Sequence, residues 1–141
     1  MSEFENITEV LNHRANRVIT KRIEPYDVIE SAKKFYDVVD YTFTGRNKFE
    51  IMEEFLSALS SNKSSIGLYM KNVNKFYLLT IKENPLKLSD VELLHRYLIT
   101  NEYGFSEEEQ VNQIGITYST DTDYAIEQID MGKAEASFII V

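Results

Sequence analysis

The spacing of hydrophobic residues changes several times along the chain, and each change marks an expected element. Where apolar side chains recur every three or four positions, the pattern predicts amphipathic helices. Four such helices are expected, at 25–36, 49–59, 89–102 and 121–131. Ser89 and Asp121 stand where N-capping residues are preferred. Residues 1–14 have a weak pattern and are interpreted as either a helix or a loosely attached arm.

Strands are predicted where apolar residues alternate or form short β-rich runs. Segments 66–70 and 76–81 are separated by asparagines that tolerate turn geometry, which predicts a β-hairpin over about 65–82. Residues 113–141 predict a strand–helix–strand unit, whose two strands could be parallel neighbours joined by a crossover helix. The last strand, from Ala136, is almost entirely apolar, which indicates a central position in the sheet.

These elements together predict an α+β fold. We expect a mixed sheet of about four to five strands, packed with three to four helices. The 141 residues fit a single domain, and 43% hydrophobic composition is enough for a packed core. No apolar run reaches the roughly 18 residues that a membrane span needs. The N-terminus lacks the basic and then apolar pattern of a signal peptide.

Charge is unevenly distributed within the net −8. Residues 1–82 carry 12 basic and 11 acidic groups, whereas residues 83–141 carry three basic and 12 acidic groups. An acidic surface repels phosphate backbones and anionic lipid, so binding to nucleic acid or a membrane through bulk charge is disfavoured. The basic residues between His13 and Arg22 are interpreted as a solvated segment that pairs with the acidic half.

The side chains available for chemistry are few. The chain has no cysteine and two histidines, which excludes thiolate nucleophiles and sulfur-based metal sites. His95, inside the expected helix 89–102, is interpreted either as an acid–base group or as a half-buried structural residue. No catalytic set, metal site or cofactor is predicted.

One ligand-binding alternative remains open at the junction of strand and helix near residue 120. Tyr118, Thr120 and Asp121 lie there, and such a junction offers backbone N–H groups and side-chain oxygens. The spacing does not match a calcium loop, and helix capping explains Asp121 equally well. Together with His95, these residues are the candidate half-site for a small phosphorylated or nucleotide-like ligand.

The order of several short phrases resembles one known family. Ile66-Gly67-Leu68-Tyr69, Tyr77-Leu78-Leu79, Leu88-Ser89-Asp90-Val91 with Leu94-His95, and Ala125-Ile126 to Ile140 are similar, in this order, to the family called domain of unknown function number 1015. The resemblance covers its middle-to-C-terminal portion, from about residue 15 to 141. The histidine-histidine-arginine motif of that family's ParB-like N-terminal portion is absent here.

The resemblance implies a bacterial or archaeal cytoplasmic protein, and we expect this chain to be an excised or truncated portion of a longer one. It transfers no catalytic residue. The expected function is a non-catalytic structural or interaction module, whose partner is the remaining portion of the parent protein or a second copy in a homo-oligomer. The alternatives are the ligand half-site and a regulatory DNA-associated role by ParB-like analogy. An exposed apolar patch is expected near the edge of the terminal strand.

Overall fold

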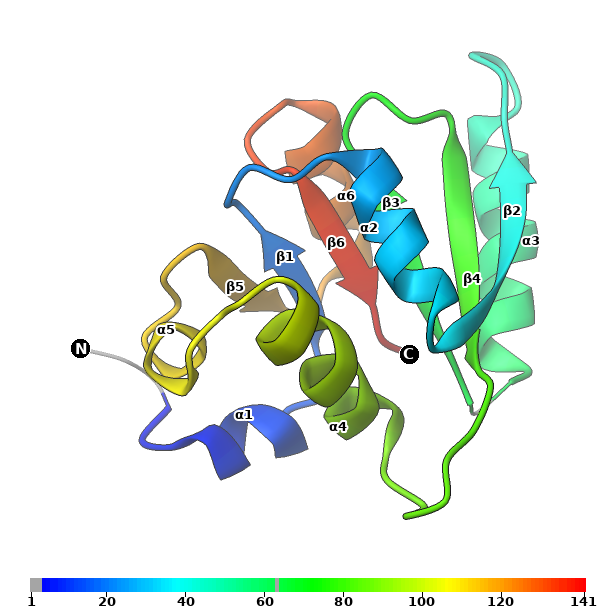
Figure 1. The fold of residues 1–141 in the computed structure, drawn as a ribbon. Helices are drawn as coiled ribbons and strands as arrows, with labels where there is room; N and C mark the ends of the chain where they lie inside the picture. Colours follow the sequence, from blue (N-terminus) through cyan, green and yellow to red (C-terminus); the bar gives the residue numbers. More distant parts are fainter. Residues whose placement is uncertain (1–3, 63) are drawn as a thin grey trace.

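The fold is built on one open, six-stranded sheet (Figure 1), seen in a computed structural model that describes residues 4–62 and 64–141. The strand order is β2-β4-β3-β6-β1-β5, and every neighbouring pair is antiparallel. The strands are β1 (Asn16–Ile19), β2 (Tyr36–Thr42), β3 (Ser65–Met70), β4 (Lys75–Ile81), β5 (Ile116–Ser119) and β6 (Ala136–Ile139).

Helices cover both faces of this sheet, which gives three layers (Figure 1). One face packs against α2, α4 and η1, and the opposite face packs against α3 and α6. The helix α1 lies beside α4 and α5. The helices are α1 (Ile7–Asn12), α2 (Pro25–Lys33), α3 (Lys48–Ser60), α4 (Asp90–Leu94), η1 (His95–Glu102), α5 (Glu107–Val111) and α6 (Thr122–Asp130). The predicted α+β class is therefore confirmed.

The predicted hairpin is also confirmed. Strands β3 and β4 pair with Ile66 opposite Leu79, and Asn72 takes a φ of 63° in the turn between them. Asparagine is among the few residues that accept this left-handed conformation readily. The next strand outward is β2, so residues 36–81 form a three-stranded half of the sheet with α3 inside the same segment.

The expected mixed sheet and parallel strand pair are wrong. Strands β5 and β6 run in the same direction, but β1 lies between them and is antiparallel to both. The crossover helix α6 therefore connects strands that are two positions apart. The N-terminal strand fills the gap, which also raises the strand count above the expected four to five. The central position expected for β6 is correct, and it places this strand away from either edge of the sheet.

Helices α4 and α6 begin directly after their predicted caps, whereas the helix expected over 25–36 ends at Lys33 because β2 begins at Tyr36. Ser89 accepts the Glu92 N–H at 3.2 Å, and Asp121 accepts the Tyr124 N–H at 3.1 Å. After Leu94 the helix continues as the π-helix η1, and near its end the Tyr103 N–H donates to the Leu98 carbonyl, five residues earlier, at 2.8 Å. Stretches of π-helix are rare and are frequently found at functional sites. His95 is the first residue of this one.

The core has one unusually close approach of helix to sheet. Gly67 in β3 lies beneath the Phe55 ring of α3, and a Cβ atom at Gly67 would overlap that ring. The Phe55 ring stacks on Phe76 of β4 with 5.1 Å between centroids. Glycine at this position therefore lets α3 pack directly on the backbone of the sheet.

Candidate functional site

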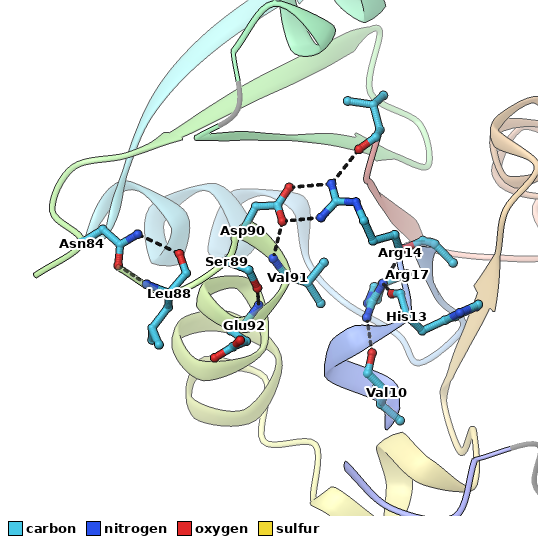
Figure 2. A network of polar contacts seen from close by, with 12 residues as sticks. Val10, His13, Arg14, Arg17, Asn84, Leu88, Ser89, Asp90, Val91 and Glu92 are labelled. Atoms are coloured by element: carbon cyan, nitrogen blue, oxygen red, sulfur yellow. Dashed lines mark hydrogen bonds and ion pairs between the residues drawn. The ribbon is translucent and has the colours of Figure 1, made fainter. Parts of the chain in front are cut away.

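The most unusual group in the interior is the guanidinium of Arg17. This side chain on β1 has no exposed surface. Its Nη1 donates to the carbonyls of His13 and Ala15 at 2.7 and 2.6 Å, and its Nη2 donates to the Val10 carbonyl at 2.7 Å. These carbonyls belong to the end of α1 and the loop that follows it, which wrap around the cation (Figure 2).

His95 completes the surroundings of that cation. The Arg17 Nε–H donates to His95 Nε2 at 2.9 Å, so Nε2 is unprotonated. The neutral ring therefore carries its proton on Nδ1, which lies 2.7 Å from Gln110 Oε1. Burial and the neighbouring Arg17 charge lower the pKa of His95 to about 4. Both ring nitrogens have protein partners, and neither is free to exchange a proton with a substrate.

Gln110 connects the histidine to the next elements. Its Nε2 donates to Thr100 Oγ1 at 3.0 Å and to the Phe105 carbonyl at 2.9 Å. The main-chain carbonyl of Gln110 accepts a hydrogen bond from the Tyr118 hydroxyl at 2.8 Å. The centroid of the Tyr118 ring lies 5.2 Å from the guanidinium carbon of Arg17. The cluster of Arg17, His95, Gln110 and Tyr118 thus joins β1, η1, α5 and β5, and we call it the buried polar cluster.

Burial disfavours the charged forms at both ends of this cluster. Desolvation lowers the pKa of Arg17 to about 10 and raises the pKa of Tyr118 to about 12. At neutral pH the arginine is a cation and the tyrosine and histidine are neutral. No carboxylate is hydrogen-bonded to Arg17 among the residues of the described ranges, so carbonyl dipoles and the histidine lone pair stabilise its charge.

A second arginine lies on the outer side of the same segment. Arg14 makes a two-pronged contact with Asp90, at 2.8 and 2.9 Å, and donates to the Val141 carbonyl at 2.6 Å (Figure 2). Ser89 and Asp90 form the start of α4, and Asp90 also accepts the Val91 N–H at 2.9 Å. These groups border a cavity of about 520 Å³. The predicted pairing of the basic segment with the acidic half is correct for Arg14, whereas Arg17 is buried.

The four predicted ligand-binding residues lie in two places. His95 and Tyr118 both contact Arg17 within the buried polar cluster. Thr120 and Asp121 are exposed in the turn between β5 and α6, and the Asp121 carboxylate caps α6. A cavity of about 290 Å³ beside His95 is lined also by Thr100 and Gln110, and by none of the other three predicted residues.

Sequence reasoning did not identify Arg17 and Gln110 as members of a buried cluster. The one available signal was the position of Arg17 inside a β-branched segment that becomes a central strand. Arginine in such a strand must either reach solvent or find acceptors in the core. Gln110 carries no such signal, because α5 is short and its sequence is dominated by exposed glutamates.

A different surface is open at the border of the sheet. β2 is an edge strand, and its hydrogen bonds to β4 involve the odd-numbered residues, since the Phe43 N–H donates to the Asn74 carbonyl and Phe35 accepts from the Lys82 N–H. The backbone groups of the even-numbered residues therefore point outward. These are Tyr36, Val38, Asp40 and Thr42, and no hydrogen bond from the described residues reaches their backbone groups.

The side chains along this edge are mixed in character. Val39 is 49% exposed in the middle of β2, and Asp37 is exposed two positions before it. Asp40 is exposed as well and pairs with Lys75 of β4 at 3.0 Å. Such an edge is a template for a further strand.

Comparison of the chain with models of known protein families, with curated proteins and with solved structures finds no match. No helix in the described ranges is long and apolar enough to cross a membrane. Within the same ranges, no three histidine or acidic side chains are grouped in a way that could hold a metal ion.

Proposed function

We propose that this chain is a non-catalytic interaction module of a larger cytoplasmic protein, and that it binds a polypeptide through the open edge of β2. The proposal includes membership of the domain of unknown function family number 1015, to which its sequence phrases are similar. The observation that supports polypeptide binding is the row of unpaired backbone groups on β2, because an added strand can form hydrogen bonds with these groups directly.

The buried polar cluster supports the non-catalytic part of the proposal. A general base needs a nitrogen or oxygen that can reach a substrate proton. In His95 both nitrogens are occupied, and 2% of the residue is exposed. The cluster instead ties the first helix and strand to η1 and α5, so its role is to hold the fold together.

The side chains along β2 also limit which strands can pair with this edge. Charged residues on an edge strand limit indiscriminate pairing, and Asp37 and Asp40 have this position. The backbone supplies affinity in strand addition, while the side chains of alternate residues select the partner. A partner strand must therefore tolerate two acidic side chains around an exposed valine.

Photo-crosslinking tests the proposal. A photoreactive phenylalanine analogue is placed at position 39 of the full chain, and the protein is irradiated in cells that produce it. We expect an adduct to a polypeptide of defined mass. The matched control carries the analogue at Ile114, which is 54% exposed and lies next to β5, at the opposite edge of the sheet.

Two outcomes would count against the proposal. One is an equal yield of adducts from positions 39 and 114. The other is thermal stabilisation by a nucleotide or sugar phosphate that disappears in His95→Gln, because that result would assign ligand binding to the predicted half-site.

A further inference from the structure

We propose that the strand that occupies the β2 edge is β2 of a second copy of this chain, arranged antiparallel about a two-fold axis at Val39. This inference rests on the proposed function and specifies the partner. The two six-stranded sheets then join into one continuous sheet across the dimer. Two-fold contacts of this kind use the same surface on both subunits.

The backbone geometry permits this pairing over the whole length of β2. With the axis at Val39, Tyr36 lies opposite Thr42 of the second copy, and Val38 lies opposite its Asp40. All four are residues whose backbone groups point outward. In an antiparallel ladder each such pair exchanges both of its N–H···O=C hydrogen bonds. No outward-facing N–H or C=O of the strand remains unpaired.

The side chains also match in this register. On the face that carries α3, Val39 meets Val39 of the second copy, which covers the half-exposed valine with an apolar partner. On the same face Asp37 lies opposite Tyr41 of the second copy, whose hydroxyl can donate to the carboxylate. On the other face Asp40 lies opposite Val38, and the two Asp40 side chains are diagonal, each paired with its own Lys75.

Neighbouring registers are less favourable. Moving the axis to Asp40 places the two Asp40 carboxylates directly opposite each other, and like charges at that position are destabilising. Moving it to Val38 leaves Tyr41 and Thr42 outside the ladder. The axis at Val39 uses all seven residues of β2 and places no acid opposite an acid.

Net charge gives the association a definite salt dependence. Each copy carries a net charge of −8, so long-range repulsion opposes dimer formation. Added salt screens this repulsion beyond roughly 10 Å at 0.1 M ionic strength. Dimerisation should therefore strengthen between low and moderate salt, whereas a contact made by opposite charges would weaken.

The register is tested by placing a positive or a negative charge at position 39, on the two-fold axis. The dimer dissociation constant of each variant of the full chain is measured by sedimentation equilibrium. Val39→Lys and Val39→Asp each place like charges opposite each other, and each alone should weaken the dimer about fivefold, the size of one cross-strand pair. Mixing the two variants should restore association, because lysine then faces aspartate. Ile114→Lys is the matched control at an equally exposed position and should leave the dimer constant unchanged.

Hydrogen exchange gives a second measurement that needs no variant. The amides of Val38 and Asp40 should become protected as protein concentration rises, whereas the amide of Val39 faces β4 and should be protected at all concentrations. A monomer at every concentration and salt, or a mixture of charge variants that does not associate, would overturn the dimer. A crosslink from position 39 to a different polypeptide would also overturn the dimer while supporting strand addition at β2.

Discussion

Replacing Arg17 by methionine tests whether the buried polar cluster holds the fold together. Methionine keeps an unbranched apolar stem but removes all the hydrogen-bond donors of the guanidinium. The Ala15 carbonyl and the Nε2 atom of His95 would then lose their partner, whereas the carbonyls of Val10 and His13 would lose one of two donors and keep a backbone N–H. At about 1.5 kcal/mol for each of the two acceptors left unsatisfied, and about 0.5 kcal/mol for the hydrogen bond lost at each of the other two, the loss is about 4 kcal/mol.

Relief of the desolvation of a buried cation offsets part of this loss, so we expect the free energy of unfolding to fall by about 3 kcal/mol. A domain of this size has a stability of about 5–15 kcal/mol, so the change is easily measured. The assay is urea unfolding followed by far-UV circular dichroism, with an unchanged slope against urea as the condition for comparing midpoints.

Arg14→Met is the matched control for this experiment. The Arg14 side chain is 51% exposed, and its pairing with Asp90 is a surface contact. We expect it to cost about 0.5 kcal/mol. If Arg17→Met and Arg14→Met lower the stability by the same small amount, the carbonyl cage around Arg17 contributes nothing and the argument is refuted.

Three further substitutions probe other features of the interior. Because the pKa of His95 is lowered from 6.5 to about 4, the unfolded chain binds one more proton between these pH values, and stability should fall as the pH decreases through that window. Between pH 7 and pH 4, His95 should account for a fall of about 3 kcal/mol in the free energy of unfolding, and this part of the fall should be absent in His95→Gln. Urea titrations of both proteins at the two pH values measure it, and the same pH dependence in both would contradict the prediction. Gly67→Ala should lower the stability by about 2 kcal/mol because its methyl group overlaps the Phe55 ring, whereas Gly45→Ala, with no heavy atom within 4 Å, should have a small effect on the melting temperature. Ser137→Ala should raise the stability by about 1 kcal/mol, since the buried hydroxyl has no hydrogen-bond partner among the described residues, and an unchanged or lower melting temperature would count against this.

Local features of the fold were predictable from the sequence because their causes are local. The caps Ser89 and Asp121 bond to N–H groups three residues away, and the hairpin turn is determined by residues between its own strands. The apolar final segment indicated a central strand, and β6 is one. In each case the physical cause lies within a few residues of the element that it predicts.

The sheet order could not be predicted in the same way. Local spacing predicts a strand at the start of residues 113–141, but not that Tyr118 in this strand lies opposite Arg17. The buried polar cluster depends on that pairing, because its members come from positions 17, 95, 110 and 118. The sequence leaves His95 as either a functional or a structural residue, because its partners Arg17 and Gln110 are distant along the chain.

The insertion of β1 between β5 and β6 has a consequence for the order of folding. Residues 36–81 can assemble β2, β3 and β4 from contacts within one short stretch of chain. In contrast, the strand partners of β1 in the sheet are residues 116–119 and 136–138, which emerge from the ribosome long after it does. Closing such long loops is slow. We therefore expect β1 to pair in the sheet only after translation has delivered β5 and β6, so that the N-terminal strand is fixed late in folding.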